Sequence, residues 1–215
     1  MSIASIKTWV DDEVLTASDL NSVISNIEDQ ALPAATQADV NAMTSTGTGL
    51  TPSSNLIVLK TATAATSWSS ATYSSIPSGV RRITIMFSGI STSGTSNIMV
   101  QIGDAGGLET TGYLGAASTL LTASAVVTAN FTTGFGVQAT TAAGTISHGA
   151  MTLTLMNSTA FTWTATSVVG HSNVAAVSTG AGAKSLSAEL TQLAITTVGG
   201  AETFDAGAIN ISYER

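Results

Sequence analysis

The chain has 215 residues, no cysteine and a formal net charge of −7, from 6 Lys and Arg against 13 Asp and Glu. Only 9% of the residues are charged and 5% are aromatic, and Ala, Thr, Ser and Gly make up more than half of the chain. This composition excludes a disulfide framework and a cysteine zinc site. It also argues against a nucleic-acid partner, because phosphate contacts require clustered cations.

The hydrophobic content is high enough for a folded core. Hydrophobic residues reach 44%, which is atypical of intrinsic disorder. No uninterrupted apolar stretch approaches about 18 residues, so the sequence predicts no membrane insertion. No long apolar run follows residues 1–10, so it also predicts no secretory signal. We therefore expect synthesis and folding in a cytoplasm, from where the folded chain can still enter an assembled particle.

The first 40 residues carry most of the net negative charge, with seven acids and one lysine. Thr16 fits a helix N-cap, and Asp19 follows near the positive end of the helix dipole. The spacing predicts a short helix of about 15 residues, or roughly 22 Å, before Pro33. Its apolar stripe repeats at i, i+3, i+4 and i+7 and consists of Leu20, Val23, Ile24 and Ile27.

A helix of this length is marginal alone in water and needs a partner. It either packs on its own domain or joins a coiled-coil-like parallel bundle of identical helices, with Trp9 and Leu15 as further attachment residues. Ser, Thr and Gly dominate residues 45–54, which is typical of a linker. The sequence thus predicts an N-terminal attachment segment at 1–44, a linker at 45–54 and a head at 55–215.

In the head, apolar and polar residues alternate with a period of two, which is typical of half-buried antiparallel strands. Ile83, Ile85 and Phe87 alternate with polar or flexible residues in this way. Further strands are predicted at 55–61, 97–103, 150–156, 161–165, 186–190 and 209–213. Turn signals lie at 77–79, 93–94, 104–107, 144, 157–158, 180–182 and 199–200. We expect a mainly β fold, an antiparallel β-sandwich or jelly roll, in which residues 114–131 form either a strand pair or a long loop.

Few residues are candidates for chemistry. His148 and His171 are the only imidazoles, and neither lies in a recognisable motif. Asp104 and Glu109 are the nearest carboxylate pair in the head. A glycosidase needs two such groups and calcium binds oxygen ligands, but acids in a Gly-rich turn more often cap or solvate the loop. With no nucleophile elbow or phosphate-binding loop, the sequence predicts no enzyme, no metal and no cofactor.

Aromatic side chains are the stronger candidates for ligand binding. Trp68, Tyr73, Tyr113 and Trp163 could each stack on a sugar ring, although Trp163 alternates with Phe161 as a core residue would. Tyr113 lies in a predicted loop and is the better candidate. The candidate receptor contacts are Tyr113, Asp104, Glu109 and His171.

Several segments resemble proteins of tailed bacteriophages. Residues 9–21, WVDDEVLTASDLN, resemble the N-terminal segment of many tail-fibre proteins, with Asp12 where glycine is common. Residues 35–43, ATQADVNAM, followed by Leu50-Thr51-Pro52, are similar to another segment of phage fibres. Residues 101–113 and 204–214 are similar to a β-rich module of phage virion proteins. Together these segments extend over most of the chain.

This resemblance implies a short homotrimeric tail fibre in the virion, synthesised in the cytoplasm of a bacterial host. Its N-terminus would dock on another tail protein, such as an adaptor, nozzle or baseplate component, and its head would bind a host-surface receptor, expected to be a glycan. A purely structural collar or decoration fibre is the alternative. A tailspike that degrades polysaccharide is a more distant one.

Overall fold

The computed structural model describes residues 57–122 and 125–215, and in this part of the chain the secondary structure is mainly antiparallel β with no α-helix. The chain divides into two compact units, residues 1–54 and 55–215, and the described residues belong to the second. The predicted N-terminal helix, its apolar stripe, Trp9, Leu15 and the linker lie outside the described residues.

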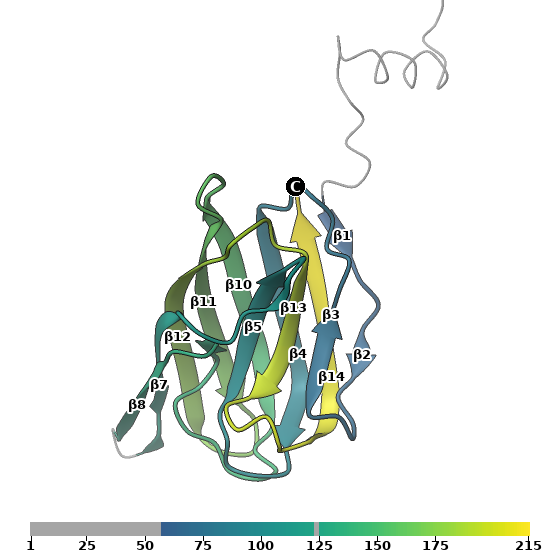
Figure 1. The fold of residues 1–215 in the computed structure, drawn as a ribbon. Helices are drawn as coiled ribbons and strands as arrows, with labels where there is room; N and C mark the ends of the chain where they lie inside the picture. Colours follow the sequence, from purple (N-terminus) through teal and green to yellow (C-terminus); the bar gives the residue numbers. More distant parts are fainter. Residues whose placement is uncertain (1–56, 123–124) are drawn as a thin grey trace, which may run out of the picture. The chain divides into compact units, whose positions relative to one another are not determined.

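The strands form two antiparallel sheets (Figure 1). In order across the larger sheet, the strands are β1 (Ile57–Leu59), β14 (Phe204–Glu214), β4 (Arg82–Thr92), β10 (Ser147–Asn157), β11 (Thr162–His171), β12 (Ala176–Ser185), β7 (Leu114–Leu120) and β8 (Val126–Phe131), and β2 (Thr63–Ala64) also pairs with β14. The smaller sheet contains β3 (Ser70–Tyr73), β13 (Gln192–Thr197), β5 (Ile98–Asp104) and β6 (Gly107–Leu108), and β9 (Phe135–Gly136) also pairs with β5.

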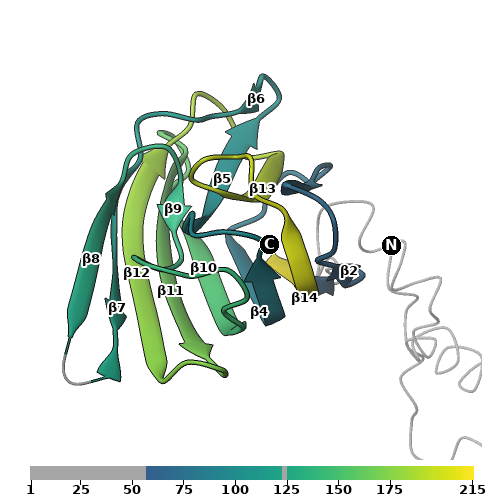
Figure 2. The ribbon, with the colours of Figure 1, turned by 90° about the horizontal axis from the view of Figure 1, so that it is seen from below.

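The two sheets face each other across one hydrophobic core (Figure 2). Alternate residues of β4 and β10 in the larger sheet point inward, and they meet inward residues of β5 and β13 in the smaller one. Representative members of this core are Ile83, Ile85, Met151, Leu153, Val100, Ile102, Leu193 and Ile195. Each such side chain contributes about 1.5–3 kcal/mol by leaving water. Trp163 belongs to the same core, as its alternation with Phe161 predicts.

Leu114–Leu120 and Val126–Phe131 form a strand pair, β7 and β8, so of the two alternatives that the sequence left open the strand pair is confirmed. The predicted strand 97–103 is β5, but Met99 and Gln101 are buried rather than exposed. The segment around β9 covers them, since the Gln101 amide donates to the Thr133 carbonyl at 2.9 Å. This second covering layer follows from tertiary packing that the alternation does not encode.

Two predictions near residue 180 are wrong. Residues 180–182 lie inside β12 rather than in a turn, and the predicted strand 186–190 is a loop between β12 and β13. Close packing explains the glycines, because a Cβ on Gly180 would lie 2.3 Å from the Gly136 carbonyl oxygen and one on Gly182 would lie 2.9 Å from that of Leu114.

The strand register defines two ends of the head (Figure 1). At the Ile57 end, residues of neighbouring strands meet in the order Ile57, Glu214, Arg82, Thr154, Thr164, Ala183 and Leu114. At the His171 end lie Ile90, Ser147, His171, Ala176, Leu120 and Val126. The candidate residues are divided between these two ends.

Candidate functional site

Tyr113 is buried, so the prediction of an exposed aromatic there is wrong. Its side chain is 1% exposed, and its ring packs edge-on against Phe135 with centroids 4.9 Å apart. The hydroxyl donates to the Glu109 carbonyl at 2.9 Å and accepts from the Ile102 N–H at 2.8 Å. Burial raises the pKa of Tyr113. Tyr113 therefore fixes the loop that precedes β7, and its ring has no exposed face that a ligand could contact.

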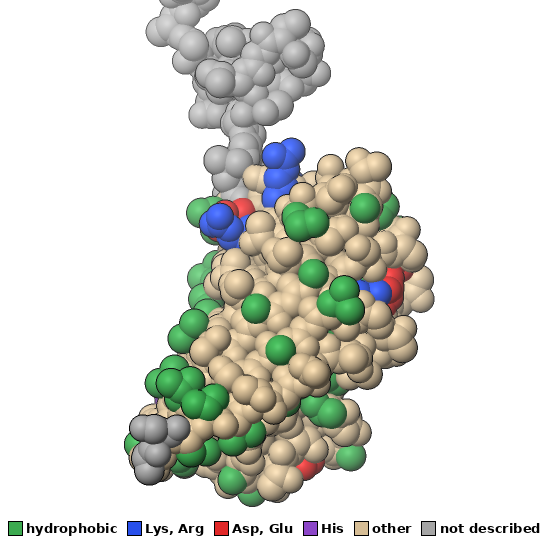
Figure 3. Space-filling view, turned by 90° about the vertical axis from the view of Figure 1, so that its left-hand side faces the viewer, with side chains coloured by type: hydrophobic (Ala, Val, Ile, Leu, Met, Phe, Trp, Pro, Cys, Tyr) green, Lys and Arg blue, Asp and Glu red, His purple; other side chains and the backbone are tan. Residues whose placement is uncertain are grey.

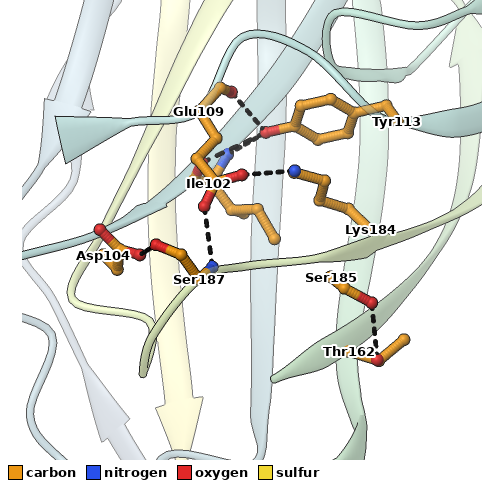
Figure 4. Close-up of polar contacts among 8 residues, drawn as sticks. All are labelled: Ile102, Asp104, Glu109, Tyr113, Thr162, Lys184, Ser185 and Ser187. Carbon is orange, nitrogen blue, oxygen red and sulfur yellow. Dashed lines mark hydrogen bonds and ion pairs between the residues drawn. The ribbon is translucent and has the colours of Figure 1, made fainter. Parts of the chain in front are cut away.

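Glu109 forms an ion pair with Lys184 beside Tyr113 (Figure 4). The Lys184 side chain is only 7% exposed, and its ammonium lies 5.5 Å from the centroid of the Tyr113 ring. A buried ammonium is costly unless it is paired, and here both the carboxylate and the ring face compensate its charge. Glu109 is therefore committed to an internal partner, and its predicted role as a receptor contact conflicts with this geometry.

Ser187 joins the two carboxylates that the sequence singled out (Figure 4). Its hydroxyl donates to Asp104, and its backbone N–H donates to Glu109 at 3.0 Å. Asp104 is buried and also accepts from the Gly106 N–H at 2.8 Å. The hydrogen bond from Ser187, followed by that from Gly106, lowers the pKa of Asp104. The pair thus fastens the 186–191 loop to the β5–β6 turn, at the Ile57 end.

His171 is buried at the opposite end of the head. Its Nδ1 lies 3.0 Å from the Ser147 hydroxyl, and its Nε2 lies 2.9 Å from the Ser178 hydroxyl. Ser178 continues the network to the Thr119 hydroxyl at 2.8 Å. Burial lowers the pKa of His171. The imidazole therefore links β10, β11, β12 and β7, and only its edge reaches the surface.

A small cavity of about 170 Å³ lies beside His171. Threonines and aliphatic residues line it, among them Thr119, Leu121, Thr141, Ala142 and Val174. Ligand pockets that enclose a drug-sized molecule measure about 300–1,000 Å³. This cavity therefore fits one substituent of a ligand whose remainder lies on the surface. The sequence identified His171 alone, because only the fold brings the 119–121, 140–145 and 174–176 segments together.

The other acids also have internal partners. Glu202 accepts hydrogen bonds from the N–H groups of Thr95 and Ser96 at 2.9–3.0 Å, and Glu189 accepts from the Ser78 hydroxyl and the Gly79 N–H. Asp205 accepts from the Ser91 hydroxyl, and Glu214 pairs with Arg82 at 3.4 Å. Within residues 57–122 and 125–215 no group of three or more His, Asp or Glu could hold a metal ion. The arrangement suits loop fixation rather than acid–base chemistry.

The other expected sugar-stacking residues are at least half-buried. Trp68 packs against Phe204 with ring centroids 4.4 Å apart, and Tyr73 donates to the Ile209 carbonyl at 3.1 Å. His148 is exposed, but its Nδ1 accepts from the Gly89 N–H at 3.1 Å and its Nε2 lies 3.2 Å from the Ser172 hydroxyl. In the part of the chain that the structure describes, no helix is long and apolar enough to cross a membrane.

Comparisons with protein-family models, with curated proteins and with solved structures find no match to this chain.

Proposed function

We propose that the chain is a homotrimeric virion tail fibre whose N-terminal segment docks on a phage tail and whose head binds a neutral host-surface glycan. The observation that carries this proposal is the pair of fibre-like motifs at residues 9–21 and 35–52, followed by an antiparallel β head. We assign the head to the jelly-roll type of β-sandwich. Two facing antiparallel sheets around one core support that assignment.

The receptor surface is assigned to the His171 end. Ile57 lies at the other end of the head, so within the head the His171 end is the one farther along the strands from Ile57. The threonine hydroxyls around its cavity can hydrogen-bond to sugar hydroxyls, and Leu121 and Val174 offer apolar contact to a sugar substituent. No charged residue lines this cavity, which favours a neutral ligand.

A second candidate function is a purely structural collar or decoration fibre without a receptor. The observation that favours it is the burial of Tyr113, Asp104 and His171, three of the four residues expected to contact a receptor. The hydrogen bonds and contacts of these residues fix strands and loops, and this role needs no ligand.

A glycan array with the full chain separates the two candidates. We expect specific binding to neutral glycans, and we expect Ala142→Trp, which fills the cavity beside His171 with an indole, to abolish it. The matched control is Ala105→Trp in the exposed β5–β6 turn at the Ile57 end, which should bind as the parent does. Binding to no glycan and to no host cell would leave the structural fibre. Equal loss in both variants would refute the assigned surface, and release of reducing ends from host polysaccharide would point to a tailspike.

A further inference from the structure

A buried chain of polar groups, which we call the hydroxyl chain, runs through the His171 end of the head. It starts at the Ala139 N–H, which donates to the Thr119 hydroxyl at 3.1 Å, and Thr119 lies 2.8 Å from the Ser178 hydroxyl. His171 links Ser178 to Ser147, through Nε2 at 2.9 Å and Nδ1 at 3.0 Å. All four side chains are buried. The hydroxyl chain therefore connects β7, β12, β11 and β10 to the segment that contains Ala139.

The hydroxyl chain suits a neutral imidazole and not a charged one. A neutral histidine has one ring nitrogen that donates and one that accepts, so it can take one hydroxyl proton, from Ser147 or from Ser178. In the imidazolium both ring nitrogens donate, and neither serine can then donate to the ring. Protonation therefore leaves one more hydroxyl proton of the chain without an acceptor, whichever tautomer the neutral ring adopts. A buried donor without an acceptor destabilises the closed structure.

In the described head, no carboxylate belongs to the elements packed against His171, which are β10, β12, β7 and residues 137–146. Their titratable residues are His148, exposed on β10, and Lys184, at the other end of β12. Asp205 lies on β14, beyond β4, and accepts from Ser91. Charged side chains are also few on the side of the molecule where β7 and β8 lie (Figure 3). An imidazolium at His171 would therefore be buried without a counter-ion, and burial lowers its pKa.

Residues 139–145 form one wall of the cavity beside His171 and contain no strand. The residues of this segment that line the cavity are Thr140, Thr141, Ala142 and Thr145. Single hydrogen bonds hold its ends: the Ala139 N–H donates to Thr119, and the Gly144 carbonyl accepts from the Asn173 amide at 2.8 Å. A segment held by such bonds opens at a lower free energy than a strand inside a sheet. It is therefore the part of the wall that can move and admit water to His171.

We infer that His171 is an acid-sensitive switch: protonation of its imidazole releases residues 139–145 from the hydroxyl chain and opens the cavity. The closed head would hold the charge without a counter-ion and with an unpaired hydroxyl proton, whereas the open head exposes the ring to water. Below the ordinary pKa of 6.5 the open form therefore binds a proton more readily than the closed form. Its population should rise about tenfold per pH unit until the closed form also binds the proton.

Amide hydrogen exchange of the full chain, measured by NMR from pH 8 to 5, tests the switch. The protection factor of the Ala139 N–H, corrected for the intrinsic pH dependence of exchange, should be constant above pH 6.5 and fall about tenfold per pH unit below it. It should also stay below the protection factors of the central β4 amides, because only a local opening is involved. A constant protection factor at Ala139, or one equal to those of β4 at every pH, would overturn the inference.

Substitution of the two histidines identifies the group that titrates. His171→Gln cannot become charged, so the protection factor of the Ala139 N–H should lose its dependence on pH. The matched His148→Gln should keep it, and the opposite pattern would refute the role of His171. Exchange is measured without a ligand, so these results do not depend on whether the head binds a glycan. A ligand that fits only the closed cavity would lose affinity in acid, because its binding is linked to closure.

An added counter-ion gives a second measurement that keeps His171 in place. Ala176 is the cross-strand partner of His171 and lines the same cavity, so Ala176→Asp places a carboxylate about 5 Å from the imidazole. This carboxylate stabilises the imidazolium in the closed head, and the decrease in Ala139 protection below pH 6.5 should disappear or reverse. Thr179→Asp, with the same charge at an exposed position of β12, should retain the decrease. Equal decreases in the two variants would refute the switch.

Discussion

At the scale of single residues, the few acids of the head act as acceptors for loop hydrogen bonds. The clearest case is Glu202, whose two carboxylate oxygens take the N–H groups of Thr95 and Ser96. Glu202→Gln leaves one acceptor where two are used, so we expect a loss of about 1–2 kcal/mol in the free energy of unfolding, measured by urea denaturation. Glu214→Gln is the matched control. Its partner Arg82 is 53% exposed, and such a surface pair is worth about 0–1 kcal/mol. Equal losses would show that loop fixation is not the role of Glu202.

The pKa of His171 predicts how acid affects the head. Because burial lowers this pKa, the unfolded chain binds a proton more readily than the folded chain just below the ordinary value of 6.5. The free energy of unfolding should therefore be constant above pH 6.5 and decrease as the pH falls toward the folded pKa. Asp104, with its lowered pKa, adds a further loss only below its ordinary value of 3.8. His171→Gln should remove the first decrease in denaturation measured from pH 7 to 5, and His148→Gln should retain it because His171 is still present.

At the scale of elements, glycine pairs control how closely β12 approaches β7 and the β9 segment. A Cβ on Gly180 would lie 2.3 Å from the Gly136 carbonyl oxygen, whereas one on Gly170 in the adjacent β11 would meet nothing within 4 Å. Gly180→Val should therefore cost about 1–3 kcal/mol or more through overpacking, and Gly170→Val should be nearly neutral. Thermal unfolding of the two variants measures the difference, and equal midpoints would contradict this role of Gly180.

Strand β12 and its neighbours show which elements could be predicted from the sequence. Alternation located β4, β10, β11 and β14, because one face of each strand is apolar and the other carries Thr or Ser. It failed at β12, because the small residues Gly180, Ala181 and Gly182 do not alternate between apolar and polar and were predicted to form a turn. It also failed at Tyr113 and His171, because the sequence places each beside a turn, and only partners such as Ile102 and Ser178 show that they are buried.

At the scale of the whole molecule, assembly and folding should depend on different parts of the chain. The described head has its own two-sheet core, whereas the predicted bundle draws on the stripe Leu20, Val23, Ile24 and Ile27. A chain without residues 1–44 should therefore still fold and unfold in one cooperative transition, whether or not it assembles. Its heads lose the effective concentration that a bundle provides, so its mass should fall to one copy at low concentration and return toward three as the concentration rises. A deletion variant that stays trimeric at every dilution would show that the head assembles without the N-terminal segment. One that stays monomeric at every concentration would assign all assembly to the N-terminal segment.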